Sequence, residues 1–252
     1  SDGAPMDVVM PEGIEEFKDA MEKDGLNPYD GSGVACFQWY AEYAKVDYPH
    51  AAYKRQWTAD QGYGYYINPI LNGDFPDPDV VRVGDTFYMV STTMFHFPGA
   101  TILKSKDHVN WEYCANPLKQ IANTDNYNLL NDRNHYAQGQ WAASLSYSKG
   151  KFYLYFISYG KNGEDEAKNI MLTTTNPEGK WDMQYWPEHY YDSGWLFDDG
   201  PNGDGNVYVA CGIGTIFVNK LDGKTLKKIS DQVVIKDYTI KGQKCDGIEG
   251  SH

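Results

Sequence analysis

The feature that most constrains the fold is a pattern of strand, turn and strand that occurs three times along the chain. It spans residues 79–91, 143–156 and 194–210, and the copies begin 64 and 51 residues apart. In each copy, runs rich in Val, Tyr, Phe and Leu flank a turn that contains Gly, which is typical of a β-hairpin. Further strand-like runs lie between the copies, at 100–105 and 169–175.

A degenerate repeat of this length, built from short antiparallel strands, is typical of the blades of a β-propeller. A fourth unit would begin at Gly250, so the sequence predicts about three blades and the start of a fourth. Because a propeller must close on itself, we expect the remaining blades to come from the rest of a longer polypeptide or from a second chain. A β-sandwich with long loops is the alternative all-β architecture.

The first 66 residues differ from the repeat. Between residues 11 and 24, Ile14, Phe17 and Met21 are spaced as on one face of a helix and are surrounded by acidic residues. This pattern predicts a short amphipathic helix. We therefore expect an N-terminal extension over residues 1–66 and an incomplete propeller domain over residues 67–252.

Composition and motifs exclude several classes of protein. The chain has 35 Asp and Glu against 22 Lys and Arg, a net charge of −13, which argues against a nucleic-acid partner. No apolar run approaches the ~20 residues that span a bilayer. The sequence also lacks the H-E-x-x-H, G-x-S-x-G and phosphate-loop patterns. Its 7 Trp, 21 Tyr and 10 Phe suit an aromatic β core and surfaces that stack on sugar rings.

Acidic residues occur at equivalent places in the repeat. Asp77, Asp192 and Glu249 each lie just before the first strand of a unit, and Trp141 holds the corresponding place in the second unit. The first strands of propeller blades surround the central axis, so these residues should converge on one mouth. Three carboxylates beside an aromatic ring fit a site that cleaves a sugar. Turn chemistry is the alternative explanation, because Asp before Pro or Ser is also a common turn former.

Several separated motifs resemble glycoside hydrolase family 43. They are residues 68–93, which include Pro76-Asp77-Pro78-Asp79, then Phe97-Pro98-Gly99, and residues 104–111. The resemblance runs from about Asn68 to His252. It implies a five-bladed propeller that hydrolyses arabinose- or xylose-containing polysaccharides with inversion of configuration. A β-xylosidase or α-L-arabinofuranosidase acting on plant hemicellulose is the first hypothesis; an endo-arabinanase and a non-catalytic glycan-binding propeller are the alternatives.

The resemblance also implies roles for the three acids. Asp77 matches the general base of the family, and Glu249 matches the general acid. Asp192 matches the residue that orients the acid and keeps it protonated. In an inverting enzyme, the base and the acid should lie roughly 6.5–9.5 Å apart, since a water molecule must fit beside the sugar.

Three further residues are candidates for substrate binding. Trp141 matches an aromatic residue that lines the sugar subsite, and Phe97 belongs to the second of the matching motifs. His252 lies beside the acid motif, where it could contact substrate. The sequence departs from the family at Ser251, where the acid motif often has Pro.

Expectations about cofactors and location follow from the same resemblance. No redox or nucleotide cofactor is required. Some family members hold a structural calcium ion on the propeller axis, but no motif in this sequence identifies its ligands. A hemicellulose substrate implies an extracellular, periplasmic or cell-surface location.

Overall fold

A computed structural model describes residues 58–62, 64–95, 99–133, 138–159, 168–237, 239–240, 243–244 and 248–250. The chain divides into two compact units, Ser1–Asn68 and Pro69–His252. The helix expected at residues 11–24 lies outside the described residues, as do the site candidates Phe97 and His252. In the first unit, the described residues form an antiparallel bridge between Asp60 and Tyr66.

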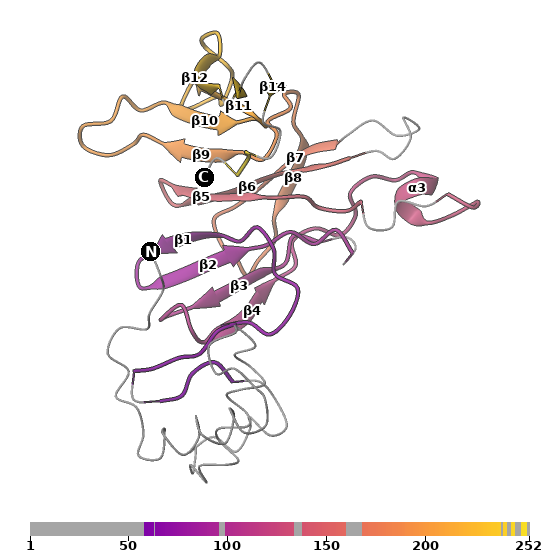
Figure 1. The fold of residues 1–252 in the computed structure, drawn as a ribbon, viewed down its shortest axis with the longest axis vertical. Helices are drawn as coiled ribbons and strands as arrows, with labels where there is room; N and C mark the ends of the chain where they lie inside the picture. Colours follow the sequence, from indigo (N-terminus) through magenta and orange to yellow (C-terminus); the bar gives the residue numbers. More distant parts are fainter. Residues whose placement is uncertain are drawn as a thin grey trace. The chain divides into compact units, whose positions relative to one another are not determined.

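In its described part, the Pro69–His252 unit contains three four-stranded antiparallel sheets (Figure 1). Within each sheet, strands that follow one another in the chain are neighbours. The first sheet is β1 (Asp79–Val83), β2 (Thr86–Val90), β3 (Ile102–Ser105) and β4 (Trp111–Ala115). The second is β5 (Ser144–Ser148), β6 (Lys151–Ser158), β7 (Lys168–Thr174) and β8 (Asp182–Tyr185). The third is β9 (Gly194–Phe197), β10 (Val207–Cys211), β11 (Thr215–Leu221) and β12 (Val233–Asp237).

The predicted hairpins are confirmed as β1–β2, β5–β6 and β9–β10. Each sheet is a simple meander, and this is the form of a propeller blade. The chain therefore supplies three consecutive blades, and the β-sandwich alternative is wrong. Two short elements complete the described structure: the one-turn helix α3 (Asp125–Asn128) and a two-stranded sheet of β13 (Thr239–Ile240) and β14 (Gln243–Lys244).

The central strands of the second sheet, β6 and β7, are buried on both faces. Alternate residues of β6 point in opposite directions, so Leu154 and Phe156 pack into one apolar cluster while Tyr155 and Ile157 pack into another. The first cluster joins the second sheet to the first through residues such as Ile102, and the other joins it to the third. This double burial explains why β6 is a continuous apolar run without polar alternation.

Side chains hold the first strands of the blades together. Strand β5 lies between β1 and β9. Asp79 in β1 accepts a hydrogen bond from the Leu145 backbone N–H in β5 at 2.7 Å. Ser144 in β5 accepts one from the Trp195 backbone N–H in β9 at 3.3 Å. These bonds link different sheets, so they set the spacing of the blades near the axis.

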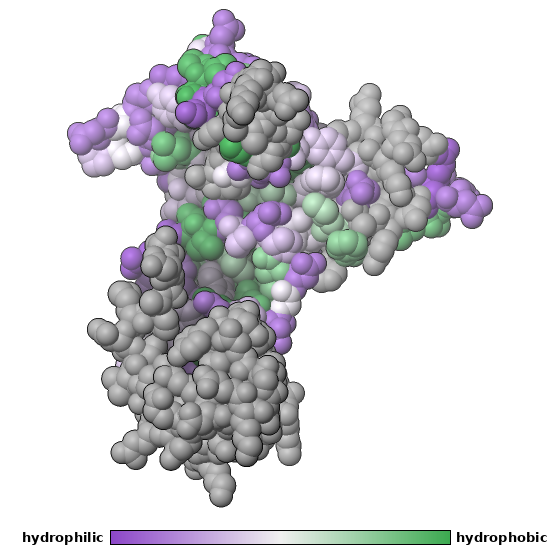
Figure 2. Space-filling view, viewed as in Figure 1, coloured by the Kyte–Doolittle hydropathy of each residue, from purple (hydrophilic) through white to green (hydrophobic). Residues whose placement is uncertain are grey.

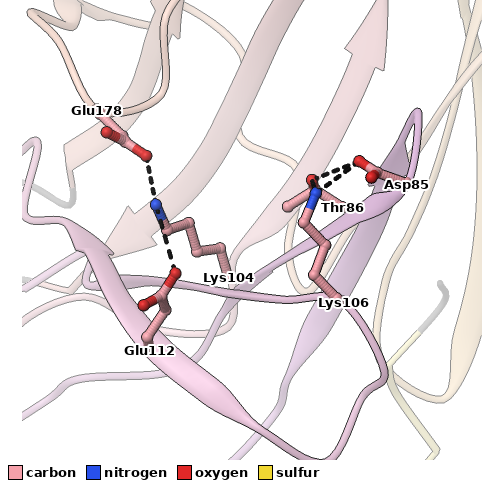
Figure 3. A network of polar contacts seen from close by, with 6 residues as sticks. All are labelled: Asp85, Thr86, Lys104, Lys106, Glu112 and Glu178. Atoms are coloured by element: carbon pink, nitrogen blue, oxygen red, sulfur yellow. Dashed lines mark hydrogen bonds and ion pairs between the residues drawn. The ribbon is translucent and has the colours of Figure 1, made fainter.

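An ion-pair network joins the first two sheets farther from the axis (Figure 3). Lys104 Nζ in β3 lies 2.5 Å from Glu178 Oε1 in the β7–β8 turn and 3.5 Å from Glu112 Oε1 in β4. The hydrogen bond with Glu178 raises the pKa of Lys104. Lys106 makes a separate pair with Asp85 at 2.6 Å. Since these groups face solvent, salt weakens the pairs and they contribute little to stability.

The third sheet ends in an exposed apolar strand. Val233, Val234 and Ile235 of β12 are all more than half exposed. Figure 2 shows green, hydrophobic surface in the region of β12. Strands of an incomplete propeller would be exposed in this way where another blade packs. In the described residues, no helix is long and apolar enough to cross a membrane.

A glycine in the β11–β12 turn is required by the close approach of another loop. A Cβ atom added to Gly223 would lie 1.7 Å from the carbonyl oxygen of Gly205, in the β9–β10 loop. We expect Gly223→Ala to lower the free energy of unfolding by about 1–3 kcal/mol, because the backbone of one loop must move. Denaturant unfolding of Gly200→Ala is the matched control, since a Cβ there meets nothing within 4 Å. Equal stability of the two variants would contradict the expectation.

Candidate active site

Asp77 lies in the turn that leads into β1, two residues before the strand begins. Its backbone is left-handed, with φ 46°, a conformation that Asp tolerates better than most residues. The segment that follows β2 holds the turn in place: Thr92 Oγ1 donates a hydrogen bond to Asp77 Oδ2 at 2.7 Å, and the Thr92 backbone N–H donates to the Pro76 carbonyl at 3.0 Å. The side chain of Asp77 is therefore fixed by the residue two positions after β2.

Asp192 occupies the equivalent position in the third blade. It also lies two residues before a first strand, β9, and it also has a φ of 46°. The backbone just before it is anchored, since the Tyr191 carbonyl accepts a hydrogen bond from the Gly212 N–H at 2.9 Å. The repeat thus places two carboxylates in the same local geometry at the entries of two blades.

Glu249 reaches the same region from the end of the described chain. The Ile248 carbonyl accepts a hydrogen bond from the Gly214 N–H at 2.8 Å, which ties this segment to the β10–β11 turn. A Cβ atom on Gly250 would lie 3.9 Å from Asp192 Oδ2, so Gly250 is next to the Asp192 carboxylate. Glu249 and Asp192 are therefore neighbours.

Trp141 is positioned by the fully buried Gln140. Gln140 Oε1 accepts a hydrogen bond from Thr93 Oγ1 at 2.7 Å, and the Trp141 backbone N–H donates to the Ile157 carbonyl at 3.0 Å. The Trp141 ring meets the Tyr159 ring edge-on, with centroids 5.0 Å apart. Among the described residues, the buried Trp141 Nε1 has no hydrogen-bond partner.

These groups meet at one cavity of about 110 Å³. Its walls carry the four candidates that the structure describes, together with four other residues: Asp77, Trp141, Asp192 and Glu249, then Met94, Ala142, Ile157 and Tyr191. The structure thus brings together residues separated by up to 172 positions in the sequence. A larger cavity of about 800 Å³ also reaches Glu249, but it is lined mainly by strand residues and does not include Asp77 or Asp192.

Tyr191 is a site residue that the sequence pattern missed. Its hydroxyl donates a hydrogen bond to Glu249 Oε2 at 2.7 Å. Burial raises the pKa of Tyr191, and the hydrogen bond and charge of Glu249 raise it further. Tyr159, whose ring centroid lies 6.2 Å from that of Tyr191, has its pKa raised by burial and by the charge of Glu249. Both phenols therefore keep their protons, and Tyr191 donates its proton to a hydrogen bond with Glu249, whereas the Tyr159 hydroxyl lies 3.2 Å from His189 Nε2.

A structural calcium ion on the propeller axis stays a prediction. In the described part of the chain, no group of three or more His, Cys, Asp or Glu side chains is placed to hold a metal ion. We assign no metal ligand.

The family model of glycosyl hydrolases family 43 matches residues 66–252. The chain belongs to this family. It is 46% identical over 123 residues to a β-xylosidase of Formosa agariphila, a match that covers 48% of this chain and 19% of the relative. It is 37% identical over 136 residues to a non-reducing end α-L-arabinofuranosidase of Bacteroides ovatus, covering 54% of this chain and 25% of the relative.

Solved structures of the family share the fold. A bifunctional family 43 protein of Bacteroides eggerthii is 33% identical, with a TM-score of 0.59 over 68% of this chain and 21% of that one. Family 43 neighbours of this kind are five-bladed propellers, which agrees with the three blades described above. The chain spans about a fifth to a third of the length of the relatives that it matches.

Proposed function

We propose that this chain carries the catalytic residues of an inverting glycosidase that releases xylose or arabinose from plant hemicellulose. The observation that carries the proposal is the convergence of Asp77, Asp192 and Glu249 with Trp141 on one cavity. The names of the β-xylosidase and α-L-arabinofuranosidase relatives support this substrate class. Activity of the whole protein also requires the blades that complete the propeller, supplied by the rest of the polypeptide or by a second chain.

In the proposed reaction, two proton transfers accompany one displacement. Glu249 donates its proton to the leaving glycosidic oxygen as the bond from that oxygen to the anomeric carbon breaks. A water molecule attacks the opposite face of the sugar, and Asp77 takes its proton, so the configuration inverts. Asp192 lies beside the Glu249 segment and orients the acid. Trp141 offers a ring for stacking on the sugar.

Two other functions are compatible with the fold. An endo-arabinanase would use the same acids with a groove that is open at both ends. A glycan-binding propeller without activity would need the aromatic residue but not the fixed carboxylates, and the hydrogen bond from Thr92 to Asp77 favours catalysis. Because the proposed substrate is a cell-wall polymer, we propose that the protein acts outside the cytoplasm, in the periplasm, at the cell surface or in the medium.

The direct test is hydrolysis by the full-length protein of an aryl β-xyloside, an aryl α-L-arabinofuranoside and linear arabinan. Proton NMR of the released sugar, recorded before its anomers equilibrate, determines the anomeric configuration of the product. Release of xylose or arabinose with inverted configuration supports the proposal. Internal cleavage of arabinan alone would favour the endo-arabinanase, and binding without turnover of any substrate would favour the glycan-binding protein.

The contact between Thr92 and Asp77 predicts a second effect. Thr92→Val keeps the shape of the side chain but removes the donor to the base, so Asp77 loses its fixed orientation. We expect kcat/KM to fall by about 10-fold, the size expected for a hydrogen bond to a charged group. Thr92→Ser retains the hydroxyl and should recover most of the activity. Full activity of Thr92→Val would show that Asp77 does not depend on this contact.

A further inference from the structure

We infer that Tyr191 positions Glu249 for proton donation and stabilises the charge that Glu249 acquires when the proton leaves. This inference rests on the proposed function, because it assumes that Glu249 is the general acid. It assigns to Tyr191 a role that neither the repeat nor the spacing of the acids revealed.

The geometry allows one oxygen of Glu249 to be held while the other reacts. The Tyr191 hydroxyl donates to Oε2 at 2.7 Å, within the range of a good hydrogen bond to a carboxylate. With Oε2 accepting from the phenol, Oε1 is left as the atom that carries the transferable proton. Both residues line the cavity that Asp77 also reaches.

The backbone of Tyr191 is fixed independently of its side chain. Its carbonyl accepts from the Gly212 N–H, and the next residue, Asp192, has the left-handed conformation that leads into β9. The turn before β9 therefore positions both Tyr191 and Asp192 next to Glu249. The phenol has two χ angles and is held at a fixed distance, so it restricts the rotation of the longer glutamate side chain.

The hydrogen bond strengthens as the reaction proceeds. When Glu249 gives up its proton, the carboxyl becomes a carboxylate, and a donor to an ionised group bonds about twice as strongly as a donor to a neutral one. An interaction that is stronger in the transition state than in the ground state raises the rate. The raised pKa of Tyr191 keeps its hydroxyl protonated throughout.

The test is the dependence of the rate on the leaving group. We compare Tyr191→Phe with the wild type in the full-length protein, using a phenyl glycoside and a dinitrophenyl glycoside of the sugar that the wild type hydrolyses. Phenolate is a poor leaving group that needs the proton, whereas dinitrophenolate leaves without it. We expect kcat/KM for the phenyl glycoside to fall by about 10- to 100-fold, and that for the dinitrophenyl glycoside to change by less than about 2-fold.

Tyr185→Phe is the matched control. The Tyr185 hydroxyl in β8 donates to the Ile121 carbonyl at 2.8 Å, and Tyr185 does not line the cavity. This variant loses a phenol hydrogen bond of nearly the same length as the one that Tyr191 makes. Because Tyr185 lies outside the cavity, both substrates should be hydrolysed at the wild-type rate. Thermal unfolding of both variants verifies that they are folded.

The outcomes separate the two proposals. If Tyr191→Phe slows both substrates equally, or neither, while Glu249→Gln slows the phenyl glycoside selectively, then the role of Tyr191 is wrong and the general acid stands. If Glu249→Gln leaves both rates unchanged, the proposed function itself is overturned. Selective loss with the phenyl glycoside in both variants supports both proposals.

Discussion

Replacing Asp77 by Asn should lower kcat for an aryl β-xyloside or an aryl α-L-arabinofuranoside by about 100- to 10,000-fold. Asn has nearly the shape of Asp but cannot take the proton of the attacking water. The Thr92 hydroxyl that donates to Asp77 can still donate to the amide oxygen, so the turn should keep its conformation. Steady-state kinetics of the full-length protein measure the effect.

Azide provides a sharper form of this test. The azide anion needs no base to attack the anomeric carbon, so it should restore turnover of Asp77→Asn and give a glycosyl azide of inverted configuration. Asp182→Asn is the control, since Asp182 is an exposed acid of β8 that pairs with Lys180. Its kcat should equal that of the wild type. An Asp77→Asn variant with wild-type kcat would remove Asp77 from the mechanism.

Phe156→Ala is expected to have the largest effect on stability, with the free energy of unfolding lowered by about 3–5 kcal/mol. Phe156 is fully buried in β6, lies opposite Ile170 in β7, and packs in the cluster that joins the first two sheets. Removing the ring leaves a cavity at a blade interface that both sheets would have to close. Urea unfolding followed by far-UV circular dichroism measures the change.

The control for this substitution lies in the same sheet. Met183 in β8 is exposed, so Met183→Ala should change the free energy of unfolding by less than about 0.5 kcal/mol. A small effect at Phe156 would mean that the first two blades are not held together by this apolar cluster.

The sequence predicted the inner part of each blade better than the outer part. The β1–β2, β5–β6 and β9–β10 hairpins were visible because buried β-branched and aromatic residues flank turns that contain Gly. The outer strand β8 was not, because all its side chains are exposed and no apolar alternation marks it; it is defined by its backbone pairing with β7. The outer strand β12, which pairs with β11, was also missed, although its Val-Val-Ile run is typical of a strand.

In the site, too, the sequence predicted some residues and missed another. The repeat placed Asp77 and Asp192 at equivalent turns, and the structure gives both the same backbone conformation. Tyr191 could not be found in this way, because its partner Glu249 is 58 residues away and tyrosine is common throughout the chain. Its position directly before Asp192 was the available signal.

The hydrogen bonds that Asp79 accepts from β5 and that Ser144 accepts from β9 have a consequence for how such a site can change. Asp77 and Asp192 belong to different blades, so their separation is set by the packing of blades rather than by the length of any loop. Insertions on the mouth-side loops can reshape the entrance for a different sugar without disturbing that separation. Changes in these loops can therefore alter the sugar specificity, while the packing of the blades keeps the distance between the two carboxylates constant.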